Sequence, residues 1–463
     1  MTFIDTERTF SAVEPKPSKF RLFLLFLTVT VATSFQDRAP EMMWDAASYL
    51  SGSMALISRG NIYEAGGLVL RGAWTPVIYS PAAAVNQIFG NGEYGEVLYT
   101  AVLLQGALLV ATISVFLLPT LIQIWFPQNS TSLIVCTLLG YFALKNFAPY
   151  SLMDLWAVAL VLLAVCLLSR PKIANLFFAG LALGICVNIR PSYLLTVVAV
   201  AVASVAYTRF RGLIVLASLI VAQIPQLAVN IFMNQRISLF PVDLKNVARQ
   251  DLDSAIFVIR YDTIAYRPWA RGAQLFCDPT MTRIALNGFP SSPFDFIKFF
   301  LTHPVESGWF YIQKLGAVLL WPTSTPYFEL NPSPRLFFGV IILLITTLGI
   351  SSLVLTRTNS STLNLPRVAT IIVVVCALVG FATSHTETRY AVPLVLIGIV
   401  GIAGFVGQSI RYGFHRSNIR GGIPTAVAVV AIAVLLAMAG NLGLKNVDSC
   451  PTVESIKNAQ TIP

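Results

Sequence analysis

Long apolar runs separated by short polar segments dominate the chain of 463 residues. Many approach the length of about 20 residues that an α-helix needs to cross the hydrocarbon core of a bilayer. The pattern predicts an all-α polytopic membrane protein with about eleven transmembrane helices, folded as a single transmembrane domain over residues 1–463. The expected spans are 20–36, 97–119, 131–145, 152–168, 174–189, 192–207, 212–234, 334–355, 368–384, 391–408 and 423–443.

One further apolar stretch, 309–321, is too short for a perpendicular span. It contains Lys314 and ends at Pro322. We interpret it as a re-entrant or interfacial segment. Counting it as a full span would also reverse the orientation of the basic loop at 411–420, which the charge pattern below opposes.

Two long segments and a tail connect or follow the apolar spans. They cover residues 37–96, 235–333 and 444–463. In the second segment Phe294 and Leu301 belong to a set of apolar residues at helical spacing, which begins after a Ser-Pro helix start. This spacing predicts a helix that lies in the membrane interface.

The distribution of arginine and lysine indicates an orientation. Basic residues cluster in alternate short connections, and the positive-inside rule assigns these connections and the N-terminus to the cytoplasm. Almost all aspartates and glutamates then face outward, as do both long segments and the tail. We therefore expect a multi-pass plasma (inner) membrane protein whose active site lies on the extracytoplasmic, or periplasmic, face. The short outward turns carry one cation each, namely Lys145, Arg190 and Arg389.

Composition supports lipid as the main solvent. The chain is 56% hydrophobic and only 11% charged, whereas soluble domains carry about 25% charged residues. The net charge of +10 is spread over loops between apolar spans. This spread favours membrane lipids and phosphate groups as partners and argues against nucleic acid.

The cysteines give no metal-binding pattern, since no CxxC or Cys/His spacing occurs. Cys277 and Cys450 would both face an oxidising compartment, so a disulfide between them and a pair of unpaired thiols are equally open. No motif for a nucleotide, dinucleotide or zinc occurs, and no cofactor is expected from the motifs.

The densest group of chemically useful residues follows the first span. Glu41 and Asp45 are four residues apart and would share a helical face, where their mutual repulsion favours binding of a proton or a cation. Asp45, close to Tyr49, is suited to act as a general base toward a sugar hydroxyl. The alternative is a helix cap followed by a solvated turn. Leu50 and Met54 fall on a different face from Asp45 and Tyr49, which indicates an amphipathic helix.

Two more outward turns carry candidate residues. Residues 384–390 contain His385, Glu387 and Arg389, a costly concentration of polar groups beside lipid. His385 and Arg389 could hold a phosphate; alternatively, Arg389 and Glu387 form an ion pair that closes the turn. Arg190 suits a lipid phosphate, or else it is an interfacial arginine before a proline-started helix.

Short motifs in this order resemble the GT-C superfamily of glycosyltransferases that use polyprenyl-phosphate-linked sugars. The closest similarity is to bacterial mannosyltransferase-like and O-antigen-modifying members with one aspartate in the first loop. The motifs extend over most of the chain, and each is short. They are Trp44-Asp45-Ala-Ala-Ser-Tyr49, Gly60-Asn-Ile-Tyr63, Tyr79-Ser-Pro81 and Arg389-Tyr390-Ala-Val-Pro393.

The resemblance implies an inverting transfer of a sugar from polyprenyl phosphate to a glycan or glycolipid acceptor. Asp45 would be the catalytic base, and Arg389, His385 and Arg190 would hold the donor phosphate. Glu41 departs from the acidic pair of metal-dependent relatives, so no metal ligand is assigned and a divalent ion (Mg²⁺ or Mn²⁺) stays an open alternative. The residues implied to contact donor or acceptor are Glu41, Tyr49, Tyr79, His385 and Glu387.

Two other functions remain open, and a non-catalytic membrane scaffold is a third possibility, which purified protein that binds no polyprenyl phosphate at any concentration would favour. A transporter or flippase of a lipid-linked sugar would carry internal repeats, and none is evident here. An O-antigen ligase or polymerase type would use outward arginine and histidine residues without an aspartate base. The substitution Asp45→Asn separates these functions, because only the glycosyltransferase should lose turnover while still binding its donor.

Overall fold

The computed structural model describes most of the chain as helices and their connections, and no strand occurs among the described residues. The described residues are 18–35, 44–60, 72–127, 129–239, 241, 278, 280–281, 284, 293–320, 332–358, 364–383, 388–412 and 416–445.

The first half of the chain begins with one helix, continues through the first long segment, and then enters the bundle. Its elements are α1 (Lys19–Ser34), α2 (Trp44–Arg59), α3 (Thr75–Ile78), α4 (Ser80–Phe89), α5 (Glu96–Thr112), the π-helical turn η1 (Ile113–Leu117), α6 (Leu118–Trp125), α7 (Ser130–Leu144), η2 (Lys145–Phe147), α8 (Met153–Leu168), α9 (Ile173–Ile189), η3 (Pro191–Tyr193), α10 (Leu194–Thr208), η4 (Arg209–Gly212), α11 (Leu213–Ala222) and α12 (Ile224–Asn234).

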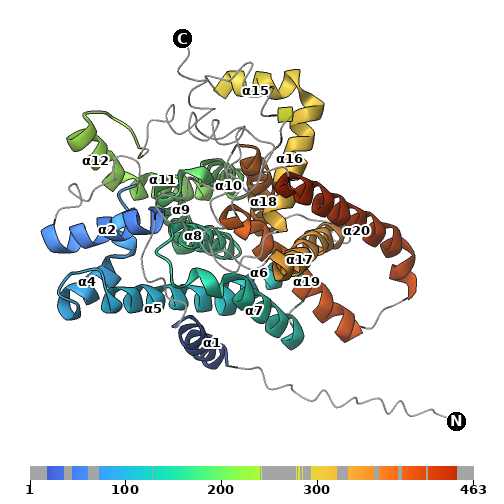
Figure 1. Ribbon diagram of the computed structural model, residues 1–463, viewed down its shortest axis with the longest axis horizontal. Helices are drawn as coiled ribbons and strands as arrows, with labels where there is room; N and C mark the ends of the chain where they lie inside the picture. Colours follow the sequence, from blue (N-terminus) through green and yellow to red (C-terminus); the bar gives the residue numbers. More distant parts are fainter. Residues whose placement is uncertain are drawn as a thin grey trace.

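In the described part of the second half, the longer helices are two in the second long segment and four that follow it. These are α15 (Pro293–Thr302), α16 (Pro304–Leu319), α17 (Pro332–Thr358), α18 (Leu365–Thr383), α19 (Thr388–Tyr412) and α20 (Arg416–Lys445). Figure 1 shows α8 and α9 side by side near the centre of the view, with α5 below α8 and α1 packed against α5.

Each of the eleven expected spans coincides with a helix or a run of consecutive helices. Among the described residues, five helical stretches are long and apolar enough to cross a membrane, and shorter apolar helices accompany them. The number of crossings therefore stays a prediction. The five stretches are Glu96–Trp125, Ser130–Phe147, Pro191–Met233, Phe337–Leu355 and Arg389–Ile410.

Glycines bring the backbones of α17 and α19 into close contact. A Cβ atom at Gly349 would overlap the carbonyl oxygen of Gly398, and one at Gly401 would overlap the carbonyl oxygen of Gly349. Membrane helices commonly pack through small residues in this way, because lipid provides no hydrophobic force to press them together. Helix α19, whose first turn carries Arg389, therefore packs closely against α17 near Gly398 and Gly401.

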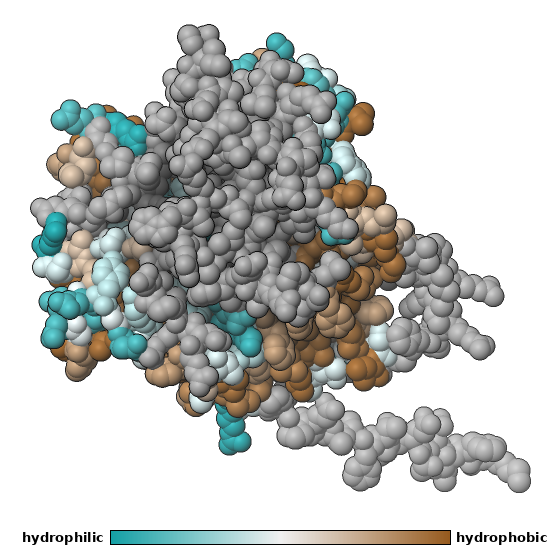
Figure 2. Space-filling model, in the orientation of Figure 1, coloured by the Kyte–Doolittle hydropathy of each residue, from teal (hydrophilic) through white to brown (hydrophobic). Residues whose placement is uncertain are grey.

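The outer surface differs between the two flanks. Figure 2 shows a largely hydrophobic flank over α20 and its neighbours, where Ile432, Leu435 and Met438 are exposed. The flank over α2 and α4 is more hydrophilic in the same view. An apolar flank of this kind is expected where a helical bundle meets lipid.

A helix, α15, lies where the interfacial helix is expected, and it begins at Pro293. Its apolar side chains Phe294, Ile297 and Leu301 are all more than half exposed. The next helix, α16, includes the ambiguous stretch at 309–321, and its Lys314 is buried. The exposed apolar face of α15 fits a helix that lies on the membrane surface.

Helix α2 differs from its expected amphipathic pattern. Tyr49 and Leu50 are both buried, although the sequence pattern separated them onto different faces. Both become buried because α3 and α4 pack against α2, and Ser151 from the turn before α8 also contacts it. The two-sided burial fixes α2 within the protein and leaves Ser51, Ser58 and Arg59 exposed.

Candidate functional site

Four charged side chains from four separate segments meet at one end of the bundle. Arg389 Nη1 donates a hydrogen bond to Asp45 Oδ2 at 3.2 Å and lies 3.7 Å from Asp154 Oδ2. Arg190 Nη2 lies 2.8 Å from Asp154 Oδ1. Asp154 thus joins both arginines, and Arg389 joins both aspartates. We call Asp45, Asp154, Arg190 and Arg389 the charged quartet.

Helix ends position all four members of the quartet. Asp45, Asp154 and Arg389 each lie in the first turn of a helix, namely α2, α8 and α19. A carboxylate in a first turn is stabilised by the positive end of the helix dipole. Arg190 follows the last residue of α9 with φ −144° and ψ 88°, outside the α region that a following proline, here Pro191, disfavours.

The Arg190–Asp154 pair is largely buried, with side chains 11% and 4% exposed. Among the described residues, Arg190 Nε has no hydrogen-bond acceptor. Burial opposes the charge of Arg190, but the Asp154 carboxylate outweighs it with help from Tyr390 and Tyr49, so the pKa of Arg190 is raised well above its ordinary value. The guanidinium therefore stays charged and keeps an N–H group for an additional acceptor.

An aromatic ring accompanies both arginines. The ring centroid of Tyr390 lies 5.0 Å from Arg190 Cζ and 5.7 Å from Arg389 Cζ. Cation–π contacts of this length stabilise a guanidinium without consuming its hydrogen-bond donors. The carboxylates therefore still direct the N–H groups of both arginines.

Tyr79 supports the quartet from inside the protein. Its hydroxyl group lies 3.2 Å from the carbonyl oxygen of Leu152 and 3.3 Å from that of Tyr150, and the indole N–H of Trp156 donates to it at 3.3 Å. Burial raises the pKa of Tyr79 above its ordinary value. The resemblance assigned Tyr79 to substrate contact, but these bonds fit the positioning of the turn that leads to Asp154.

A hydrogen bond joins α2, which carries Asp45, to the turn before α8, which carries Asp154. Ser151 Oγ donates to the carbonyl oxygen of Ala46 at 2.7 Å, and both groups are buried. Ala46 follows Asp45, and Ser151 precedes Asp154 by three residues. The bond therefore fixes the separation of the two carboxylates.

A buried network of amide side chains holds the turn that carries Arg190. Asn188 Oδ1 accepts a hydrogen bond from the backbone N–H of Trp74 at 3.0 Å, and Asn188 Nδ2 lies 3.2 Å from Gln223 Oε1. Gln226 Oε1 accepts from the backbone N–H of Ala73 at 2.8 Å. Because buried and satisfied amide networks are rigid, this network ties the first long segment to the end of α9.

The site contains one important residue that sequence analysis missed, Asp154. It lies at the start of an apolar span, between Met153 and Leu155. The sequence pattern did not mark it as a site residue distinct from these apolar neighbours. The available signal was an acidic residue within a membrane span, because such a residue usually faces a partner or a cavity. Its two arginine partners are distant in sequence and could not be identified from local spacing.

The structure brings together three of the predicted site residues, Asp45, Arg389 and Arg190, and buries Tyr49 and Tyr79 nearby. The remaining predicted residues lie outside the described part of the chain, so the predicted disulfide and several polar contacts stay predictions. These residues are Glu41, His385, Glu387, Cys277 and Cys450.

The donor set of the quartet suits an anion better than a metal ion. Both carboxylates face an arginine, which competes with a cation for their oxygens. In the part of the chain that the structure describes, no three histidine, cysteine, aspartate or glutamate residues are grouped as metal ligands would be. Two guanidinium groups, in contrast, offer the forked donors that bind phosphate.

The chain matches no protein-family model, no curated protein and no solved structure in the comparisons made. Function must therefore be inferred from the quartet and from the helical bundle that holds it.

Proposed function

We propose that the protein is a membrane glycosyltransferase. More specifically, we propose an inverting enzyme that transfers a sugar from a polyprenyl-phosphate donor to a glycan or glycolipid acceptor on the extracytoplasmic face. The observation that carries the proposal is the contact between Asp45 and Arg389. It joins a carboxylate suited to proton abstraction to a guanidinium suited to a phosphate.

In the proposed reaction, an acceptor hydroxyl attacks C1 of the donor sugar while Asp45 accepts the hydroxyl proton. The bond between C1 and the phosphate oxygen breaks on the opposite face of the ring, and its electron pair stays with polyprenyl phosphate. Configuration at C1 is inverted. No nucleotide is required, because the phosphate ester of the donor supplies the leaving group.

The charges of the quartet support this order of events. With both carboxylates ionised, the two negative and two positive charges balance. When Asp45 accepts a proton, the quartet gains a net positive charge beside the departing phosphate. This positive charge appears only as the transition state develops. It accelerates the chemical step, because it stabilises the leaving group more than the bound substrate.

The two arginines have different roles in the proposal. Arg190 is held by Asp154 and has an N–H group without an acceptor among the described residues, so it offers a fixed donor to a phosphate oxygen. Arg389 lies between Asp45 and Asp154. When the donor binds, Arg389 gives up part of its contact with Asp45 and contacts the donor phosphate instead. Donor binding would thereby release Asp45 to act as a base.

The helical surroundings suit a lipid-borne donor. The quartet lies at the ends of α8, α9 and α19, and α19 forms a stretch long and apolar enough to cross a membrane. A polyprenyl chain is apolar and partitions into the hydrocarbon core, while its phosphate stays near the interface. Cationic side chains at helix ends are therefore well situated to meet the phosphate.

The test compares Asp45→Asn with the wild-type protein in lipid nanodiscs. We expect transfer from a panel of undecaprenyl-phosphate sugars to fall by about 10²- to 10⁴-fold, the usual contribution of a general base. Binding of undecaprenyl phosphate should be retained. Glu306→Gln removes a carboxylate that, like Asp45, lies in the first turn of a helix but is outside the quartet, and it is the matched control. Undiminished transfer by Asp45→Asn would contradict the assignment of the base.

A further inference from the structure

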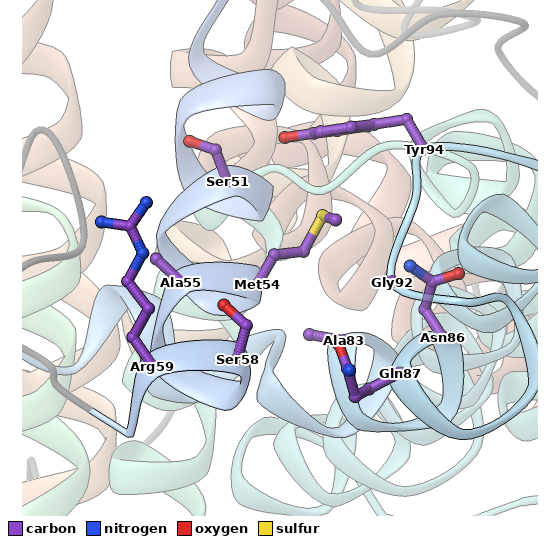
Figure 3. A pocket seen from close by; sticks show the side chains of 10 residues that line it. All are labelled: Ser51, Met54, Ala55, Ser58, Arg59, Ala83, Asn86, Gln87, Gly92 and Tyr94. Atoms are coloured by element: carbon purple, nitrogen blue, oxygen red, sulfur yellow. The ribbon is translucent and has the colours of Figure 1, made fainter.

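A polar pocket lies between α2, α4 and the turn that follows α4, on the first long segment of the chain. Its volume is about 220 Å³, which corresponds to roughly seven water molecules at about 30 Å³ each. Figure 3 shows helix α2 on one side and Gln87 and Asn86 on the other, with Tyr94 across the upper edge. The lining residues are Ser51, Met54, Ala55, Ser58, Arg59, Ala83, Asn86, Gln87, Gly92 and Tyr94.

The lining combines hydrogen-bonding groups with an apolar base. Serine hydroxyls, two carboxamides, a phenol and a guanidinium supply both donors and acceptors, whereas Met54, Ala55 and Ala83 are apolar. No lining residue is a carboxylate, so the pocket is not suited to a cation. A sugar ring matches this mixture, because its hydroxyl groups both donate and accept and its C–H faces pack against apolar groups.

The wall formed by Asn86 is held in place by the following turn. Asn86 Nδ2 donates to the carbonyl oxygen of Glu93 at 2.9 Å, and the backbone carbonyl of Asn86 accepts from Gly90 at 2.7 Å and Gly92 at 3.2 Å. Gly92 adopts φ +76°, a conformation that glycine allows without strain. Asn86 is buried, and its Oδ1 has no donor among the described residues. The pocket is thus preformed.

The position of the pocket relative to Asp45 constrains its ligand. Ser51 lies six residues beyond Asp45 on α2, a rise of about 9 Å, and Arg59 lies fourteen residues beyond it, about 21 Å. At 100° per residue, Ser51, Met54 and Ser58 occupy a different face of α2 from Asp45. A ligand in the pocket therefore does not meet the base directly, although it lies along the same helix.

We infer that this pocket is an acceptor subsite that binds one sugar ring of an oligosaccharide while another ring presents its hydroxyl to Asp45. This inference rests on the proposed function and narrows its acceptor to a glycan of more than one sugar. The pocket is smaller than the roughly 300–1,000 Å³ of sites for drug-sized ligands, which agrees with a single ring.

The test measures binding directly and needs no turnover. The wild-type protein in nanodiscs is examined by saturation-transfer difference NMR with methyl glycosides of mannose, galactose, glucose, rhamnose and N-acetylglucosamine. At least one glycoside should bind. Ser58→Phe, which fills the pocket from an exposed position, should abolish its signal, and Gln87→Ala should weaken affinity about tenfold. Val85→Phe on the exposed, non-lining surface of α4 is the matched control and should bind normally.

Two further measurements separate the possible outcomes. Asp45→Asn should retain glycoside binding, because the pocket and the base act on different rings. If Asp45→Asn abolishes transfer but no glycoside binds the wild type, the proposed function stands and the subsite is wrong. Glycoside binding that persists in Ser58→Phe would also overturn the subsite. Binding of glycerol 3-phosphate alone, lost in Ser58→Phe, would instead identify a phospholipid headgroup site and overturn it.

Discussion

Asp45 and Arg389 are separated by 344 residues and form a hydrogen bond of 3.2 Å. The contact joins the first turn of α2 to the first turn of α19. It requires both segments to lie at the same end of the bundle. The proposal of one reaction centre depends on this proximity, because a base and a phosphate site at opposite ends could not act on one donor.

Replacing Arg389 should weaken binding of the donor more than it affects folding. Arg389→Gln removes a charge-assisted contact to phosphate of about 1.5–3 kcal/mol, so we expect the Kd for undecaprenyl phosphate to rise by roughly 10- to 150-fold. Arg389→Lys should recover only part of the affinity, since lysine lacks the forked donor geometry. Equilibrium binding in nanodiscs measures the change, with exposed Arg170→Gln as the control. Unchanged affinity in Arg389→Gln would remove Arg389 from the phosphate site.

Asp154 should contribute both to stability and to positioning of the arginines. Asp154→Leu leaves the buried charge of Arg190 without its partner, and breaking a buried pair costs about 3–5 kcal/mol. The double variant Asp154→Leu/Arg190→Met removes both charges and should recover most of the thermal stability, but not donor binding. Thermal unfolding in detergent, combined with binding of undecaprenyl phosphate, separates the two effects. A double variant as unstable as the single one would contradict this account of the pair.

Contact between α17 and α19 should depend on the absence of a side chain at Gly349. Gly349→Leu forces the two backbones apart, and overpacking of this kind costs about 1–3 kcal/mol. Gly380→Leu is the matched control, because a Cβ atom there meets nothing within 4 Å. The midpoint of thermal unfolding should fall for Gly349→Leu and change little for Gly380→Leu. Equal shifts would indicate that the glycine contact does not hold α19.

The sequence was sufficient to predict most helices. Apolar runs near bilayer length correspond to α5, α8 and α19, because lipid forces backbone hydrogen bonds to be satisfied within each segment. Helix boundaries were less predictable where a proline ends one helix and begins the next. Pro304 separates α15 from α16, which begins well before the apolar stretch that was noticed in the sequence.

Partners across the bundle were harder to predict than the helices themselves. Asp45 and Arg389 were separate candidates in the sequence, and nothing local indicated that they touch. Asp154 was missed because the mean hydropathy of an apolar run stays high when the run contains a single acidic residue. The burial of Tyr49 depends on how α3 and α4 pack around α2, a tertiary arrangement that helical periodicity does not contain.

The predicted orientation can be tested by labelling of single cysteines in a variant whose native cysteines are replaced by serine. Glu93→Cys and Lys172→Cys are both exposed positions, predicted to face opposite sides of the membrane. A membrane-impermeant maleimide should label Glu93→Cys in intact cells, and Lys172→Cys only after permeabilisation. The reverse pattern would assign the quartet to the cytoplasmic face and contradict an extracytoplasmic reaction.

The most direct test of the central claim is an experimental structure of Asp45→Asn with undecaprenyl phosphate bound. The account predicts density for the phosphate between Arg389 and Arg190, with the side chain at position 45 facing the position of the sugar C1. The prenyl chain should lie along the ends of α8 and α19 and enter the bilayer. A phosphate bound elsewhere, with the contacts among Asp154, Arg190 and Arg389 undisturbed, would contradict it.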